Sequence, residues 1–187
     1  MKQVVLLATL VLFVFAIGAF ATDKKEEYSY IGAAKCKMCH KSEKSGKQYT
    51  IWSEGPHAKA FETLASEHSM KIGKEMGIED PQKSEKCLKC HAPSHAVKAE
   101  LKGPKWDITE GVSCEDCHGP GSAYQKMSVM KAITAGEAKA EDYGLWLPNE
   151  EMCLKCHNEE SPTFKPFKFE ERVKKIAHPI PAGEEKK

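Results

Sequence analysis

The sequence predicts a mainly α fold made of short helices and loops. Apolar residues recur at helical spacing in several short segments, and no segment shows the sustained alternation of a β-strand. A second observation is an internal repeat, because the pattern Cys-x-x-Cys-His occurs four times and uses all eight cysteines. The length of 187 residues suits a single folded domain.

Helix-end signals predict where several of these elements lie. A proline at a first helical position, an asparagine followed by acidic residues, and an i, i+4, i+7 apolar pattern stopped by prolines are typical signals. They predict helices that begin at Pro56, at Asn149 and at Phe169, and a further helix over about 122–134.

The first 21 residues have the layout of a secretory signal peptide. Lys2 precedes an uncharged apolar run over 4–20, and residues 19–21 form a small-x-small cleavage site. The run is just long enough for an uncleaved membrane anchor, but the polar residues that follow it at once favour cleavage. We therefore expect an exported, periplasmic protein in which residues 1–21 are removed and residues 22–187 form one domain.

The charge of the chain excludes one class of partner. Lys2 is the only charged residue of the leader, so the rest of the chain has equal numbers of basic and acidic residues. The lysines are spread along the sequence, and Arg172 is its one arginine. Scattered, balanced charge is typical of a solvated surface, and we expect no nucleic-acid partner. A membrane partner is expected only if the leader is not cleaved.

A histidine follows every cysteine pair, and this decides between three interpretations of the cysteines. An even count in an exported chain suits a disulfide framework, and two Cys-x-x-Cys pairs can form a four-thiolate zinc site. Neither requires the histidine, whereas Cys-x-x-Cys-His is the attachment signature of haem c. In chain order the four motifs supply the thioether pairs Cys36 and Cys39, Cys87 and Cys90, Cys114 and Cys117, and Cys153 and Cys156, with the proximal ligands His40, His91, His118 and His157.

The spacing within each motif fits covalent haem attachment. Two thiols one short turn apart can add to the two vinyl groups on one edge of a porphyrin, and the adjacent imidazole then lies under the iron. Four motifs predict four covalent haems. In so small a chain the haems would supply much of the buried apolar surface, so we expect the short helices and loops to wrap around them.

The ligand on the second face of each iron determines what each haem can do. A second histidine gives a low-potential carrier, a methionine raises the potential, and a vacant face can bind a small molecule. After the four proximal ligands, the remaining histidines are His57, His68, His95 and His178. Counting therefore permits four bis-histidine haems but does not require them.

Beyond the motifs, three segments resemble the tetrahaem cytochrome c-554 family. They are WSEGPHAKAF at 52–61, GVSCEDCHGPG at 111–121 and FKFEERVKKIAH at 167–178. The resemblance implies that His57 lies opposite His118 and that His178 lies opposite His157. It also implies that the second haem, bound through His91, is five-coordinate and open.

The sequence departs from this family at the first haem. The relatives have a histidine shortly beyond the third proximal ligand, and it binds the first iron, whereas this chain has Met127 and Met130 in that segment. Either thioether could bind the first iron and raise its potential, or both methionines could pack as core.

Two histidines have weaker assignments. His95 follows His91 by four residues, so on a helix both would point to the same side and His95 could not reach the opposite face of the same iron. It could serve a neighbouring haem, stand beside an open site, or be a surface residue. His68 lies in a polar stretch, and we expect it to be solvated.

Two functions from different classes fit these observations. One is an electron carrier that passes electrons between periplasmic or membrane-bound redox proteins through closely packed haems. The other is a reductase that binds nitric oxide, nitrite or hydroxylamine at the open second haem. No set of residues near the second motif is committed to substrate protonation, although Lys89, His95 and Lys98 are close in sequence. The carrier is therefore favoured. A subunit of a larger multihaem complex is a third interpretation that the sequence leaves undecided.

Overall fold

The protein is described by a computed structural model that covers residues 27–178. The expected signal peptide lies outside the described residues, and so do residues 22–26 and 179–187, which include the two prolines expected to stop the last helix. The helices are α1 (Ala33–His40), η1 (Glu43–Ser45), α2 (Gln48–Glu54), η2 (His57–Lys59), α3 (Ala60–Thr63), α4 (Glu67–Glu75), α5 (Glu85–His91), η3 (Pro93–Ala96), η4 (Ala99–Leu101), η5 (Ile108–Glu110), α6 (Cys114–His118), α7 (Met127–Ala135), η6 (Ala140–Tyr143), α8 (Glu150–Leu154) and α9 (Phe169–Val173).

The predicted fold class is confirmed. Residues 27–178 contain no β-strand, and the one β-bridge there joins Tyr30 to Lys102. The longest helices, α4 and α7, have nine residues each, whereas a bilayer-spanning helix needs about 20. Accordingly, no helix of the described segment is long and apolar enough to cross a membrane.

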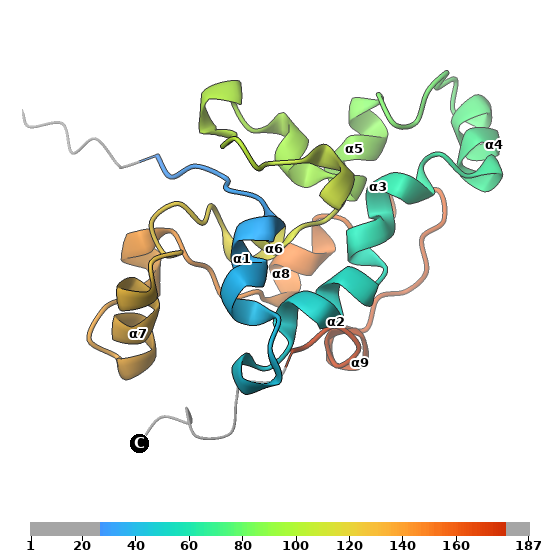
Figure 1. Ribbon diagram of the computed structural model, residues 1–187. Helices are drawn as coiled ribbons and strands as arrows, with labels where there is room; N and C mark the ends of the chain where they lie inside the picture. The colour runs from blue at the N-terminus through green and yellow to red at the C-terminus, as the bar shows by residue number, and fades with distance from the viewer. Residues whose placement is uncertain (1–26, 179–187) are drawn as a thin grey trace, which may run out of the picture.

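The helices pack in two groups around the middle of the molecule. In one group α1 packs against α2 and α6, and in the other α5 packs against α3 and η3. Figure 1 shows α1 in front of α6 at the centre, with α4 at one edge of the molecule and α7 at the opposite edge. The helices that carry the motifs are therefore central.

A buried carboxylate fixes α1 and α6 relative to each other. Glu115, on α6, has only 1% of its surface exposed. Its carboxylate accepts hydrogen bonds from the backbone N–H groups of Ile31 at 2.8 Å, Gly32 at 2.7 Å and Gly121 at 2.6 Å. Glu110 accepts a further bond from the N–H of Ala33, at 2.9 Å. The start of α1 is thus held by two acidic side chains from the segment around the third motif.

The apolar core of the polypeptide is small. The buried hydrophobic residues of the described chain are Ile31, Ala33, Leu64, Leu88, Ala92 and Tyr124. Several large apolar side chains are exposed instead, with Leu147 at 78% and Met127 at 62%. Apolar surface left uncovered on this scale is the surface that a bound porphyrin would bury.

Three predicted helix starts are confirmed. Pro56 leads into η2 and α3, and Phe169 begins α9. Asn149 caps α8, because its side-chain oxygen accepts a hydrogen bond from the N–H of Met152 at 2.9 Å.

The helix predicted from residue 122 begins later, at Met127. The residues before it form a compact turn, in which the Tyr124 hydroxyl donates to the Gly119 carbonyl at 2.6 Å and the Gln125 N–H donates to the Gly121 carbonyl at 2.9 Å. Burial of Tyr124 holds this turn against α6, which the helical spacing of the sequence did not reveal.

Candidate haem-binding site

All four motifs adopt the helical turn that their spacing predicts. The first three end helices α1, α5 and α6, so each places two thiols and an imidazole on successive turns of one helix. The fourth begins at the end of α8, and the N–H of His157 continues the helical bonding to the carbonyl of Cys153 at 3.0 Å. All eight cysteines are described and all are free, so the structure contains no disulfide framework.

The thiols of different motifs lie side by side. Cys36 of the first motif hydrogen-bonds to Cys114 of the third, which raises the pKa of Cys114 and lowers that of Cys36. Cys156 of the fourth motif bonds in the same way to Cys90 of the second, and this lowers the pKa of Cys90 to about 7.

The third and fourth motifs are also neighbours, because Cys117 and Cys153 are close enough to interact electrostatically. The motifs therefore follow one another in space in the order first, third, fourth, second.

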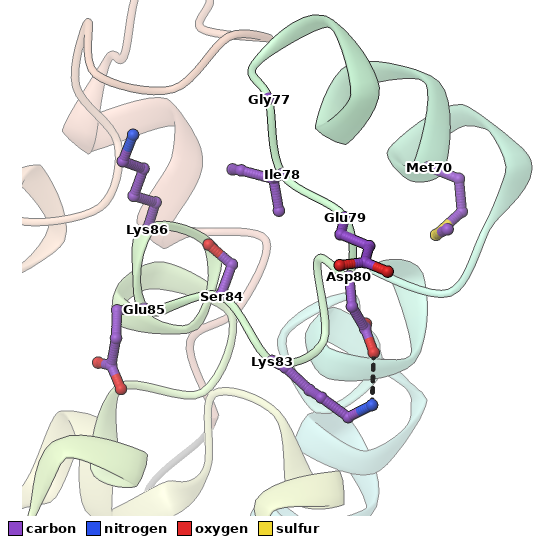
Figure 2. Close-up of a pocket in the computed structure, with 9 residues that line it drawn as sticks. All are labelled: Met70, Gly77, Ile78, Glu79, Asp80, Lys83, Ser84, Glu85 and Lys86. Atoms are coloured by element: carbon purple, nitrogen blue, oxygen red, sulfur yellow. Dashed lines mark ion pairs between the residues drawn. The ribbon is translucent and has the colours of Figure 1, made fainter.

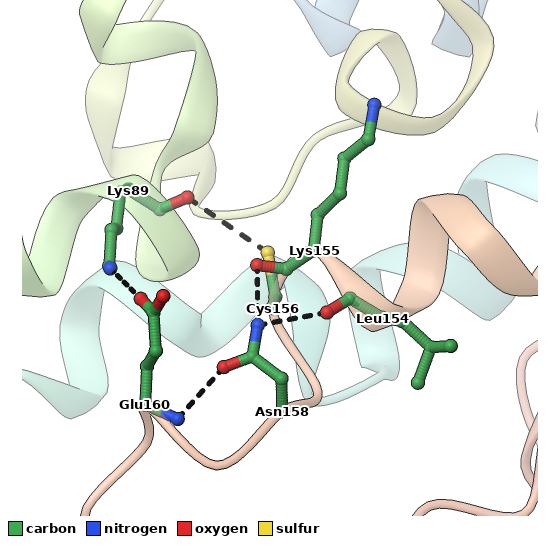
Figure 3. Close-up of polar contacts among 6 residues, drawn as sticks. All are labelled: Lys89, Leu154, Lys155, Cys156, Asn158 and Glu160. Atoms are coloured by element: carbon green, nitrogen blue, oxygen red, sulfur yellow. Dashed lines mark hydrogen bonds and ion pairs between the residues drawn. The ribbon is translucent and has the colours of Figure 1, made fainter.

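Contacts around Lys89 join the second and fourth motifs. Figure 3 shows the Lys89 carbonyl facing the Cys156 thiol, with Sγ and oxygen 3.9 Å apart, and the Lys89 ammonium paired with the Glu160 carboxylate. Asn158 closes the turn after the fourth motif by donating to the carbonyl oxygens of Leu154 and Lys155. The two motifs are thus connected by their own backbone and flanking residues.

Three of the four proximal imidazoles are oriented by a hydrogen bond at Nδ1. The partner of His40 is Gln48 Oε1 at 3.3 Å, and that of His118 is the Trp146 carbonyl at 3.2 Å. His91 bonds to the Ala60 carbonyl at 2.7 Å. An Nδ1–H bound to an oxygen leaves Nε2 as the free lone pair, which is how metal-binding histidines are held in proteins.

Two histidines from distant segments lie opposite motif histidines. The ring centres of His57 and His157 are 6.1 Å apart, and those of His178 and His118 are 6.0 Å apart. Two imidazoles on opposite faces of one metal ion, each with a metal–nitrogen distance of about 2 Å, have ring centres roughly 6 Å apart. Both pairs therefore have the spacing of axial ligands to a single iron.

The histidine rings that lie close together in the structure are not the pairs that the family resemblance implied. His57 was expected opposite His118 and His178 opposite His157, but the structure brings His57 to His157 and His178 to His118. A backbone hydrogen bond positions His57, because its carbonyl oxygen accepts from the N–H of Val112 at 3.0 Å. That bond fixes the His57 turn beside the start of the third motif while its ring faces the fourth.

Burial favours the metal-binding form of these rings. It lowers the pKa of His57, His118 and His157, so each imidazole stays neutral down to a lower pH than that of a free histidine. Neutral imidazole is the form that coordinates a metal.

His95 does not lie on the same helix as His91, contrary to the geometry considered from the sequence. The helix ends at His91 because Ala92, before Pro93, leaves the helical conformation with φ −159° and ψ 66°, and His95 belongs to the separate turn η3. Its Nδ1 lies 3.2 Å from the Ala92 carbonyl and its Nε2 lies 2.6 Å from a Glu85 carboxylate oxygen. Both ring nitrogens are occupied by protein groups in this arrangement, so it offers no free nitrogen to an iron. His68 is exposed, as expected.

Met127 and Met130 lie on α7, whereas α1, which bears His40, packs mainly against α2 and α6. Met127 is 62% exposed and Met130 is partly buried. The structure therefore shows no close packing of α7 against α1 that would place either methionine beside His40.

The residues present fit covalently bound haem. The paired thiols, the oriented imidazoles with free Nε2 atoms and the uncovered apolar side chains are the groups that haem c requires. Within residues 27–178, no group of three or more Cys, His, Asp or Glu side chains is arranged to hold a bare metal ion.

Sequence reasoning missed the acidic side chains that support the third motif. Burial raises the pKa of Glu110 and Glu115, and it raises that of Asp116 to about 6, against the hydrogen bonds that lower all three. Asp116 accepts the N–H of Ser113 at 2.6 Å in a capping box, a pattern that Ser-x-x-Asp in the sequence could have revealed. No sequence signal marks Glu115, because its partners are backbone groups of distant segments.

One groove lies away from the motif histidines. It has a volume of about 920 Å³ and lies between the end of α4 and the start of α5. Figure 2 shows its polar lining, which includes the Asp80–Lys83 ion pair at 2.9 Å. No proximal or distal histidine lines it, so it is not a face of an iron site.

Comparisons with known proteins agree with the motifs. The family described as cytochrome c554 and c-prime matches residues 35–119, which contain the first three motifs and His57. The fold is similar to that of reduced cytochrome c554 from Nitrosomonas europaea, with 26% identity, a TM-score of 0.50, and coverage of 80% of this chain and 79% of that chain. No curated protein sequence matches. The resemblance expected from the sequence is confirmed, because the family model matches residues 35–119 and the fold is similar to that of a cytochrome c554.

Proposed function

We propose that this protein is a periplasmic tetrahaem electron carrier. The observation that carries the proposal is the spatial order of the motifs, in which α1 of the first motif packs against α6 of the third, and the Cys156 thiol of the fourth lies 3.9 Å from the Lys89 carbonyl of the second. Haem edges attached at neighbouring thiols are close together, and a haem iron supplies reversible one-electron chemistry. A chain of adjacent haems suits passage of electrons between two redox proteins.

In this proposal two haems have two histidine ligands each. His57 pairs with His157 at the fourth haem, and His178 pairs with His118 at the third, as their ring spacings of 6.1 and 6.0 Å indicate. Bis-histidine ligation favours a low-potential, low-spin carrier with no vacant face. The third and fourth haems then form the middle of the electron path.

The first and second haems differ from these two. For the first, we propose a thioether ligand from Met127 or Met130, which would give it the highest potential of the set. For the second, held by His91, we propose an open distal face.

A reductase acting at an open second haem is the weaker candidate. The three side chains near the second motif that could deliver protons are each engaged by a glutamate. Lys89 pairs with Glu160, His95 with Glu85 at 2.6 Å, and Lys98 with Glu27 at 3.0 Å. None of these side chains is held ready to protonate a bound nitrogen ligand.

The first test is the haem count and export of the purified holoprotein. Intact mass spectrometry should show four haems on a chain that begins at Thr22, isolated from the periplasm. A mass with fewer haems, or a chain that retains residues 1–21 in the membrane, would contradict the proposal.

The second test is low-temperature EPR of the oxidised holoprotein and its variants. His57→Ala and His178→Ala should each convert one low-spin haem to high spin, while His68→Ala, which changes an exposed histidine, should alter nothing. Met127→Leu and Met130→Leu separate the two thioether candidates, because only the true ligand's loss changes the first haem.

The pairing is tested in a Cys153→Ser/Cys156→Ser background that lacks the fourth haem. There His57→Ala should add no high-spin signal, whereas His178→Ala should still add one from the third haem. The reverse result would restore the pairing that the family resemblance implied.

A further inference from the structure

The surface around the first motif is strongly basic. Lys35, Lys37 and Lys41 are exposed on α1 and just beyond its end, and Lys44 is exposed on η1. None of the four forms an ion pair with a side chain of residues 27–178, whereas the neighbouring Lys47 pairs with Glu43 at 2.5 Å. We call these four lysines, together with Met38, the basic surface.

Met38 gives the basic surface an apolar centre. Its side chain is 79% exposed, the highest value among the large hydrophobic residues of the described chain. Lys35 lies three residues before it and Lys41 three residues after it, which places all three on one side of the helical turn. An exposed apolar residue inside a charged rim is the usual composition of a transient protein interface.

The position of the basic surface is suited to electron transfer. Met38 lies between Cys36 and Cys39, the two attachment residues of the first haem, and Cys39 is itself exposed. The first motif also stands at one end of the spatial order of the four motifs. A protein bound here would reach the first haem before any other.

The region around the fourth motif has the opposite charge. Residues 150–160, around the fourth motif, contain four glutamates and one lysine, and the whole chain is almost neutral. A general affinity for anions is therefore not expected, and the charge of the basic surface selects a complementary partner.

We propose that the basic surface is the docking site of an acidic redox protein that exchanges electrons with the first haem. The inference rests on the proposed carrier function and adds the class of partner and its place of contact. Opposite charges steer such a partner to the surface and accelerate association, and the effect declines as salt screens the charges.

The test is stopped-flow reduction of the oxidised holoprotein by flavodoxin hydroquinone, used as a small flavoprotein with an acidic surface around its FMN. At an ionic strength of about 0.01 M, Lys35→Glu/Lys44→Glu should lower the second-order rate constant by about tenfold or more. Near 1 M, where the Debye length is about 3 Å, the variant and the wild type should have similar rates. Neither substituted side chain makes a hydrogen bond or ion pair in the described structure, and both residues are exposed in short helices.

The matched control is Lys71→Glu/Lys74→Glu, which makes the same change of net charge on exposed positions of α4 at the edge of the molecule. It should change the flavodoxin rate by less than about twofold, because its charges lie far from the docking site. Equal effects of the two double variants would overturn the proposal, since only net charge would then matter. A wild-type rate that does not fall with salt would also overturn it.

Two further measurements distinguish the docking site from a failure of the carrier function and from a membrane-binding surface. Reduction by photoreduced lumiflavin, which is small and neutral, should be equal in all variants. Failure of that reaction in the wild type would disprove the carrier function itself rather than the docking site. Binding to vesicles with anionic headgroups that requires Lys35 and Lys44, without any effect on the flavodoxin rate, would assign the basic surface to a membrane and overturn the proposal.

Discussion

At the scale of single residues, Glu115 has the most consequence for the fold. Its buried carboxylate is the shared acceptor for three backbone N–H groups, which come from both sides of the contact between α1 and α6. Glu115→Gln keeps the size of the side chain but turns an amide N–H₂ toward those donors, leaving at least one unsatisfied. We expect the free energy of unfolding of the holoprotein to fall by about 3 kcal/mol, measured by guanidinium denaturation.

The control for this substitution is Glu137→Gln, at an exposed position just beyond α7. It should change the free energy of unfolding by no more than about 0.5 kcal/mol. If Glu115→Gln were equally mild, the carboxylate would not be what holds the first and third motifs together.

At the scale of elements, Gly111 positions the turn that bears His57. Gly111 has a φ of 66°, and a Cβ there would lie 2.6 Å from the His57 carbonyl oxygen. Gly111→Ala should therefore displace η2, lower the free energy of unfolding by about 2 kcal/mol or more, and move the haem served by His57 toward high spin in EPR. Gly136→Ala also places a side chain at a positive φ, 77°, in the left-handed helical region, and its Cβ would meet no atom within 4 Å. It should cost stability without changing any EPR signal, and a matching EPR change in both variants would disprove the positioning role.

The same elements show what could be predicted from the sequence. Motif spacing predicts the helical turns directly, because thiol and imidazole positions within one turn are a local property. The rings nearest His57 and His178 differ from those that the resemblance implied, since sequence separation does not determine where a distant turn will lie. The acceptors that orient His91 and His118 are backbone carbonyls of Ala60 and Trp146, and a carbonyl has no identity in the sequence. The lysines appeared evenly spread along the chain, and only the fold shows which of them lack acidic partners.

At the scale of the whole molecule, the order first, third, fourth, second predicts how each haem depends on the others. If the proposed carrier function holds, we expect electrons that enter at the first haem to reach the second through the fourth, because the Cys156 thiol lies 3.9 Å from the Lys89 carbonyl of the second motif and Cys117 interacts electrostatically with Cys153. In Cys153→Ser/Cys156→Ser, which lacks the fourth haem, reduction by flavodoxin hydroquinone should become biphasic, with the second haem lagging behind the first and third.

In Cys87→Ser/Cys90→Ser, which lacks the second haem at the end of the order, the remaining three should be reduced in a single phase at the wild-type rate. Stopped-flow absorption changes, with circular dichroism as a check that both variants remain folded, distinguish these outcomes. A lag in the second variant but not in the first would mean that electrons follow a different path through the molecule.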